Sequence, residues 1–233
     1  ELTFTEKKDL DIGMSASALD DVAKRCESAG VEIAAVIAHY AQRGNLLSLD
    51  PAEREACTRC LRRSLDIAGA VGATGTLLHP GQLSGEGTYQ EAWENLREAL
   101  RSFGPLAEER RVSIGLENVW NKFLLSPHEA AQFVDEVNHP WVGIYLDTAN
   151  MMAYGHPEQW IRALGSRIKK VHLKDFARRE HAFVNLLDGD TDWPLVMSEL
   201  RTVGYDDTLI HEVSGDRDAL IDLGHRMRQI VAM

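Results

Sequence analysis

Short apolar runs alternate with helix-like segments along the whole 233-residue chain, and this alternation limits the possible folds more than any other feature. The runs are residues 31–38, 75–80, 112–119, 142–150, 168–176 and 208–214. Each is apolar nearly throughout rather than at every second position, which is typical of a parallel strand buried on both faces. Residues 1–4 have the character of the tail of a seventh strand.

Helix start signals stand between these runs. Asp50 and Pro51 supply an N-cap and a proline at the first helical position, and Glu53 adds an acid to the first turn. Ser126 and Glu129 have the spacing of a capping box. Further helices are expected after Ser15, Pro157, Asp192 and Asp216.

Repeated strand–helix units with right-handed crossovers build either an open doubly wound sheet or a closed barrel. No Gly-x-Gly-x-x-Gly motif follows a predicted strand, so the dinucleotide-binding form of the open sheet lacks support. Since α/β barrels run to about 200–250 residues as one domain, we predict an α/β TIM (β/α)8 barrel with residues 1–233 as its single domain. The strands fall short of eight, so the first β/α unit is expected to be missing or truncated.

Acidic residues outnumber basic ones, 36 to 25, for a net charge of -11. This charge disfavours nucleic acid and anionic membrane as partners, because both bind basic surfaces. A phosphorylated small molecule stays open, since a few local cations suffice for it. The three cysteines are a low, uneven number that suits a reducing compartment, and no run approaches the roughly 18 apolar residues of a membrane helix. We therefore expect a cytoplasmic protein.

Metal-capable side chains stand near the carboxyl end of four successive predicted strands: Glu117, Asp147, His172 and Glu212. The carboxyl ends of barrel strands meet at one mouth, where active sites lie. A lone aspartate is more often a helix cap and a lone histidine more often a core residue, but four in register favour one divalent-metal site. Three carboxylates and an imidazole suit Mn²⁺, the leading candidate, or Mg²⁺, Co²⁺ or Zn²⁺.

The runs GLENVWNKF, YLDTAN, KKVHLKDF and IHEVSG resemble the xylose isomerase-like superfamily of sugar phosphate isomerases and epimerases, which includes ketose 3-epimerases and hexulose-6-phosphate isomerases. The similarity covers residues 75–214 and is looser before them. It implies that the same four residues bind one metal ion, with Glu117 and Glu212 as acid and base. Two departures count against activity on free ketohexoses. Asn150 replaces a histidine, and Leu124 replaces a substrate-contacting glutamate.

Polar and aromatic side chains near the same strand ends are candidates for substrate binding. They are His79, Asn118, Trp120, Asn150, Lys174 and Arg178. Arg178 also matches an arginine that contacts substrate in the family, six residues after the metal histidine. Packing explains Trp120 equally well, and a salt bridge explains Lys174 equally well. His211 is expected to point away from the barrel interior, because successive strand residues face opposite sides.

The predicted partner is a small sugar or sugar phosphate, and the family favours a dimer or tetramer. In the expected mechanism one glutamate removes a proton beside the carbonyl of a metal-bound substrate, and the other glutamate returns one to a metal-stabilised enediolate. Return to the same carbon gives epimerisation, return to its neighbour gives isomerisation, and loss of a β-hydroxyl makes the enzyme an inosose-type dehydratase. An apurinic endonuclease, which needs more zinc ligands and a basic face, and a non-catalytic sugar-binding barrel are the remaining alternatives.

Overall fold

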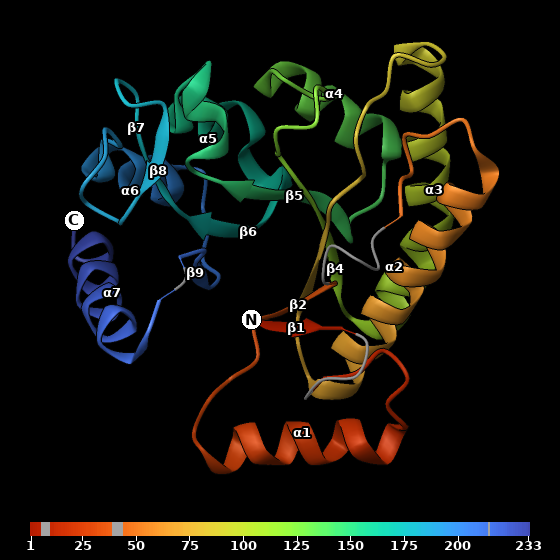
Figure 1. The fold of residues 1–233 in the computed structure, drawn as a ribbon, viewed down its shortest axis with the longest axis horizontal. Coiled ribbons are helices and arrows are strands. Elements are labelled where there is room, and N and C mark those ends of the chain that lie inside the picture. Colours follow the sequence, from red (N-terminus) through yellow and green to blue (C-terminus); the bar gives the residue numbers. More distant parts are fainter. Residues whose placement is uncertain (6–9, 39–43, 214) are drawn as a thin grey trace.

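The computed structural model describes residues 1–5, 10–38, 44–213 and 215–233. Seven parallel strands form one curved sheet in the order β1-β2-β3-β4-β5-β6-β9 (Figure 1). Their bounds are β1 (Leu2–Phe4), β2 (Ala35–Ala38), β3 (Gly75–Leu78), β4 (Ser113–Glu117), β5 (Val142–Asp147), β6 (Ile168–Leu173) and β9 (Leu209–His211). The prediction of an α/β TIM barrel is confirmed in the form of an open barrel with seven of the eight strands.

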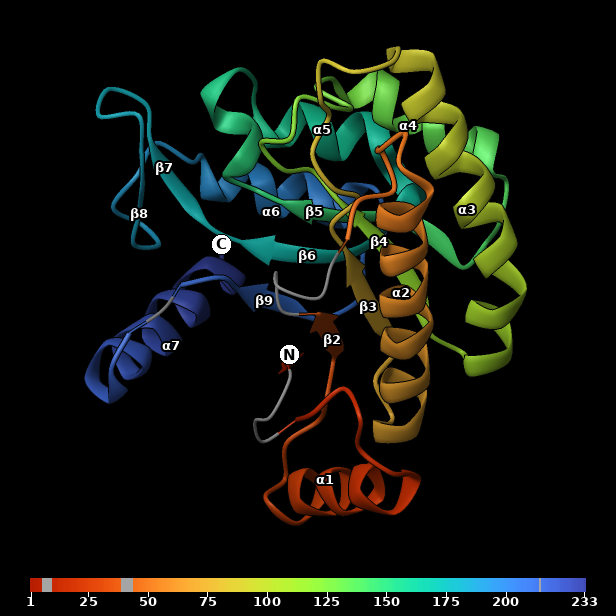
Figure 2. The same ribbon diagram turned by 45° about the vertical axis from the view of Figure 1, so that its right-hand side comes forward.

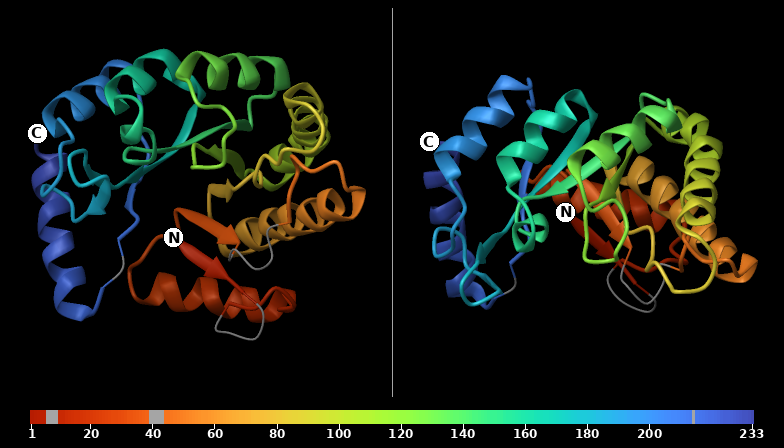
Figure 3. Two further views of the ribbon diagram at one scale, coloured as in Figure 1. Left: turned by 45° about the horizontal axis from the view of Figure 1, so that its top comes forward. Right: turned by 90° about the horizontal axis from the view of Figure 1, so that it is seen from above.

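Helices cover the outer face of this sheet. They are α1 (Ala16–Ser28), α2 (Pro51–Val71), α3 (Tyr89–Arg110), α4 (Pro127–Val137), α5 (Pro157–Leu164), α6 (Trp193–Thr202) and α7 (Arg217–Val231). Two 3-10 turns, η2 (Asn150–Ala153) and η3 (Gly165–Arg167), flank α5. The ring of helices is interrupted between α7 and α1, where the edge strands β1 and β9 each pair on one side only within the described residues (Figure 3).

A short antiparallel hairpin, β7 (Asp175–Ala177) and β8 (Ala182–Val184), follows β6 and projects beyond its carboxyl end (Figure 2). The predicted run at 168–176 is therefore two strands, separated at Lys174. The run at 31–38 becomes a strand only from Ala35, and Ser214 of the last predicted run lies outside the described residues. The runs at 75–80, 112–119 and 142–150 extend past the carboxyl ends of β3, β4 and β5 into the loops at the barrel mouth.

The expected helix caps are largely as the sequence predicts. The side chains of Asp50 and Ser126 accept hydrogen bonds from the first turns of α2 and α4. The capping box of α4 is half formed, because Glu129 accepts from the backbone N–H of Leu125 and not from that of Ser126. A complete capping box, made by Thr88 and its partner three residues on, begins α3.

Two layers of apolar side chains hold the strands. The larger core lies between the sheet and the helices, and β5 is buried at all six positions. Inside the barrel, Tyr145 packs with small and aliphatic residues of β2 and β3. Gly115 of β4 makes room for it, since a Cβ there would lie 2.9 Å from the Tyr145 side chain. At the amino-terminal end of the barrel, buried Lys170 donates to Thr74 and Asp207, so this end is closed by a paired charge.

Candidate metal centre

Strand register brings the four predicted ligands together at the carboxyl end of the sheet. Asp147 pairs with His172 across β5 and β6, Glu117 ends β4, and Glu212 follows β9. One ligand atom from each of these residues lies within 4.8 Å of the ligand atoms of the other three. Metal–ligand bonds of about 2.0–2.3 Å place opposed ligand atoms about 4–4.6 Å apart. The four residues, hereafter the four-ligand cluster, therefore have the spacing to surround one ion.

Two atoms of the four-ligand cluster are buried without a hydrogen-bond partner: Asp147 Oδ2 and His172 Nδ1. A buried polar atom left unpaired costs about 1–3 kcal/mol, which metal ligation would offset. These two atoms are a carboxylate oxygen and an imidazole nitrogen, both suited to a divalent cation. The cluster thus fits the ion that the sequence predicts.

Asp147 is held in place by its neighbours. Its Oδ1 accepts from the backbone N–H groups of Ala149 at 2.8 Å and Asn150 at 2.7 Å. The Asn118 side chain accepts from the Asp147 N–H at 2.9 Å and donates to its carbonyl oxygen at 3.0 Å. With Oδ1 and the main chain engaged, Oδ2 is left for the centre of the cluster.

Burial and mutual repulsion perturb the acids of this site. Burial, reinforced by Glu117 and Glu212, raises the pKa of Asp147 to about 7, although Lys174 opposes the shift. Burial also acts to raise the pKa of Glu212, but Lys174 outweighs it and the pKa lies below its usual value. For His172, burial acts to lower the pKa, whereas the hydrogen bond with Glu1 and the negative charges of Glu1 and Glu117 prevail and raise it to about 10. The site is therefore short of positive charge.

Lys174 partly supplies that charge. Its Nζ lies 2.8 Å from Glu212 Oε2 and 3.8 Å from Asp147 Oδ2, and 4.1 Å from the centre of the Phe183 ring. Lys174 thus forms the salt bridge that the sequence analysis considered, and this salt bridge lies within the site.

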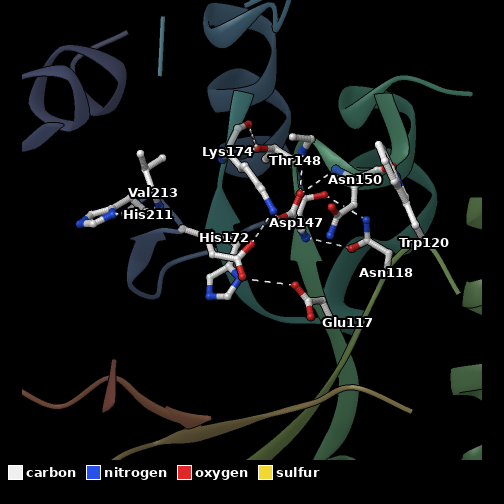
Figure 4. Close-up of polar contacts among 12 residues, drawn as sticks. Glu117, Asn118, Trp120, Asp147, Thr148, Asn150, His172, Lys174, His211 and Val213 are labelled. Carbon is white, nitrogen blue, oxygen red and sulfur yellow. Dashed lines mark hydrogen bonds and ion pairs between the residues drawn. The ribbon is translucent and has the colours of Figure 1, made fainter. Parts of the chain in front are cut away.

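Three further predicted substrate residues surround the four-ligand cluster. Asn118 and Asn150 bond Asp147 as described, and Trp120 Nε1 donates to the Asn150 carbonyl at 2.6 Å (Figure 4). The Trp120 ring is 46% exposed and stacks on Phe183 of β8. Exposed apolar side chains that gather in this way commonly mark a binding surface.

Arg178 and His79 are placed differently. Arg178 donates to the carbonyl oxygens of Met152 and Gly155, so its guanidinium holds the segment that follows β5. His79 accepts at Nδ1 from the Gly81 N–H and lines a small pocket together with Cys57 and other residues of α2. Their predicted contact with substrate stays a prediction.

His211 lies outside the barrel interior, as expected from strand alternation. Its neighbour Ile210 packs with the inner cluster around Tyr145, and Figure 4 shows the His211 ring turned away from the four-ligand cluster.

Sequence reasoning missed two contributors, Glu1 and Tyr145, and Asp175 holds the adjoining loop. Glu1 hydrogen-bonds His172, Tyr145 hydrogen-bonds Glu1, and Asp175 accepts from the backbone N–H groups of Leu187 and Gly189 and from the Trp193 ring N–H. Tyr145 could have been found, because it stands two residues before Asp147 and so shares its face of β5. Asp175 thereby organises the loop before α6.

Comparison with known proteins agrees with this geometry. A sequence profile of the family described as "Xylose isomerase-like TIM barrel" matches residues 1–231. The L-ribulose-5-phosphate 3-epimerase UlaE of Shigella flexneri is 25% identical over 182 residues, which are 76% of this chain and 62% of that protein. The probable endonuclease 4 of Mycobacterium ulcerans is 26% identical over 174 residues, 67% of this chain and 65% of that protein. The chain thus spans less than two thirds of the length of either relative.

The fold also matches solved structures. That of a D-tagatose 3-epimerase-like protein superposes with a TM-score of 0.81 at 21% identity, over 94% of this chain and 84% of the other. None of the described helices combines the length and apolar character needed to cross a membrane. On its profile match, which extends over almost the entire sequence, the chain belongs to the xylose isomerase-like TIM barrel family.

Proposed function

We propose that the chain is a divalent-metal-dependent epimerase or isomerase of a ketose or ketose phosphate. The observation that carries the proposal is the four-ligand cluster, with its two buried atoms that lack a hydrogen-bond partner. The likeness to an L-ribulose-5-phosphate 3-epimerase supports a ketose phosphate as the substrate class. Mn²⁺ is the first candidate for the ion, with Mg²⁺, Co²⁺ and Zn²⁺ as alternatives. When bound, the ion supplies Lewis-acid polarisation of the substrate carbonyl.

Glu117 and Glu212 are proposed as the proton-transfer pair. They come from β4 and from the end of β9, the outer two of the four strands that carry the cluster. One glutamate removes the proton beside the carbonyl, and the other returns a proton from the opposite face. This order inverts the carbon, and return to the neighbouring carbon interconverts aldose and ketose.

The remaining polar groups bind and orient the substrate in this proposal. Lys174 can pass its hydrogen bond from Glu212 to a substrate oxygen or phosphate, because its ammonium already lies among the cluster. Trp120 offers an exposed ring to the carbon face of a sugar. His79, Asn118, Asn150 and Arg178 complete the proposed set. We further propose that residues 1–233 act as one domain, in the cytoplasm, as a dimer or tetramer.

Exchange in D₂O tests the function directly. With Mn²⁺ present, we expect deuterium to enter one carbon of one member of a panel of ketoses, ketose phosphates and inososes, L-ribulose 5-phosphate included. Glu212→Gln at saturating metal should lower that exchange by about 10²–10⁴-fold. Glu98→Gln, at an exposed position of α3, is the matched control and should exchange like the parent. If no panel member exchanges although the protein binds Mn²⁺, the epimerase proposal fails and a binding barrel is favoured.

The same panel separates the rival reactions. Water loss from an inosose would identify a dehydratase. Cleavage of DNA at an abasic site would identify an endonuclease, as the likeness to endonuclease 4 suggests. Against that rival, the described residues contain one group with metal-ligand geometry, and the net charge of -11 opposes phosphate backbones.

A further inference from the structure

A hydrogen-bonded chain lies behind His172, on the side away from the four-ligand cluster. His172 Nε2 is 3.2 Å from Glu1 Oε2, and the Tyr145 hydroxyl donates to Glu1 Oε1 at 2.7 Å. Glu1 precedes β1, the far edge of the sheet from β6, so it reaches His172 across the barrel interior rather than along the sheet. Both oxygens of this carboxylate are thus engaged with interior residues.

This contact decides which ring nitrogen faces the cluster. A carboxylate accepts only, so the hydrogen of His172 must be on Nε2 for the contact with Glu1. In the neutral ring, the form that binds a metal ion, the lone pair is then on Nδ1, which is one of the two buried atoms without a hydrogen-bond partner and lies 3.7 Å from Glu117 Oε1. The Nδ1 atom is therefore the one available to a cation.

Packing also restrains the ring from turning to the other arrangement. His172 has no exposed surface, and the Tyr145 ring lies against it with centroids 4.5 Å apart. The same tyrosine therefore supports the imidazole twice, through its ring and through Glu1. A buried ring with one nitrogen fixed keeps the other in a constant direction.

We propose that Glu1 and Tyr145 are positioning residues that fix His172 in its Nε2–H form and present Nδ1 to the metal ion. The inference rests on the proposed metal site and adds two residues to it. Carboxylates that accept from the far nitrogen of a metal-binding histidine typically contribute 10–100-fold to metal affinity. Neither residue belongs to the four-ligand cluster, so their effect reaches the metal ion through His172.

Metal affinity is the first test. On the full chain, competition with a fluorescent chelator should show Mn²⁺ binding about 10–100-fold weaker in Glu1→Ala, with Tyr145→Phe and Glu1→Gln in between. Thr3→Ala is the matched control, because Thr3 stands on β1 two residues after Glu1 and so faces the same side. It should bind as the parent does. If Glu1→Ala fails to fold, Glu1→Gln and Tyr145→Phe carry the comparison.

The state of the imidazole is the second test, and a merely structural role would not change it. In the Zn²⁺-loaded parent, nitrogen NMR of labelled histidine should show a protonated Nε2 and a metal-shifted Nδ1 for one ring. In Glu1→Ala that signal should divide between two ring arrangements. Unchanged affinity together with an unchanged signal in folded variants would overturn the proposal.

The outcomes separate this proposal from the proposed function. A parent protein that binds no metal ends both. A parent that binds metal and shows the expected variant effects, yet exchanges no substrate, leaves the positioning pair in place and removes the epimerase. A parent that turns over while Glu1→Ala binds metal equally well removes only the positioning pair.

Discussion

The strands at the centre of the sheet are longer and more deeply buried than those at its open edge. β5 has six residues, all buried, between two paired neighbours, whereas β1 and β9 have three residues each at the edges. The outer helices follow the same division. α4 buries four of its 11 residues, but α1 buries one of 13 and α7 two of 15. Fewer buried apolar residues mean less stabilisation of the edge.

The four-ligand cluster crosses this boundary. Asp147 and His172 stand on central strands, whereas Glu212 follows the edge strand β9 and Glu1 precedes the edge strand β1. The central strands therefore hold Asp147 and His172 in place before a metal ion binds. The position of Glu212, at the edge, depends more on what binds there. Functional regions are commonly taken from the less stable end of a structure.

Truncation of a buried side chain should give the largest difference in unfolding free energy between the centre and the edge. Phe133 of α4 has no exposed surface and packs edge-on against Trp93 at 4.9 Å, so Phe133→Ala should cost about 3–5 kcal/mol of unfolding free energy. Ile221 of α7 is 51% exposed, and Ile221→Ala should change stability by less than about 0.5 kcal/mol. Urea unfolding measures both. Equal losses would show that the edge packs as firmly as the centre.

The sequence could predict those features that depend on strand position and register. The apolar runs identify the strands because buried parallel strands are continuously apolar. Glu117, Asp147, His172 and Glu212 follow from their place at strand ends. Register alone brings these strand ends level, so no loop detail is needed to predict the cluster.

Contacts across the barrel and within loops escape such reasoning. The pairing of Glu1 with His172 depends on sheet curvature, which brings a residue of the far edge to β6. The engagement of Arg178 by carbonyl oxygens depends on the path of the segment after β5. Neither leaves a periodic pattern in the chain, and both require the three-dimensional structure.

Metal addition should narrow the difference in local stability between the centre of the sheet and its edge. An ion that binds only the folded protein stabilises it by about 2.7 kcal/mol at a concentration 100 times its Kd. Because Glu212 links β9 to the central strands through the ion, hydrogen exchange should slow more in β9 than in β5. Thermal unfolding with and without Mn²⁺, and exchange followed by mass spectrometry, measure these effects. Uniform protection would contradict an edge that depends on the metal.

The next largest predicted effect is the pH dependence of metal affinity, because a binding ion releases protons from the cluster. Below pH 7 Asp147, with a pKa of about 7, and His172, with a pKa of about 10, both hold protons without metal, and an ion must displace them. Affinity should rise about tenfold per pH unit for each displaced proton, or about 1.4 kcal/mol. The rise should be steeper below pH 7, where two protons leave, than above it.

The stability of the metal-free protein should show the opposite trend. Both pKa values are raised on folding, so the folded state holds its protons more tightly than the unfolded state. The stabilisation is full below the unfolded pKa values and falls as the pH rises through about 7 and then 10. Denaturation and metal titrations from pH 5.5 to 8 measure both trends. A pH-independent Mn²⁺ affinity would refute the protonated cluster.

Substitution of Lys174 should produce the smallest change in stability. It tests the link between the centre and the edge of the sheet, because Lys174 joins the two. It follows β6 and bonds Glu212, which is 41% exposed, so the ion pair contributes less than about 1 kcal/mol. Lys174→Met should lower metal-free stability by no more than that. It should strengthen Mn²⁺ binding severalfold, since a cation 2.8 Å from one ligand and 3.8 Å from another competes with the ion.

Lys169→Met is the matched control for Lys174→Met, because it removes the same charge from β6 near its opposite end, where Lys169 lines a separate pocket. Equal changes in Mn²⁺ affinity would assign the effect to net charge rather than to the cluster. If affinity rises only in Lys174→Met, the ammonium acts locally as a substitute for the metal. The edge ligand Glu212 is then held toward the centre by a lysine before an ion takes over that role.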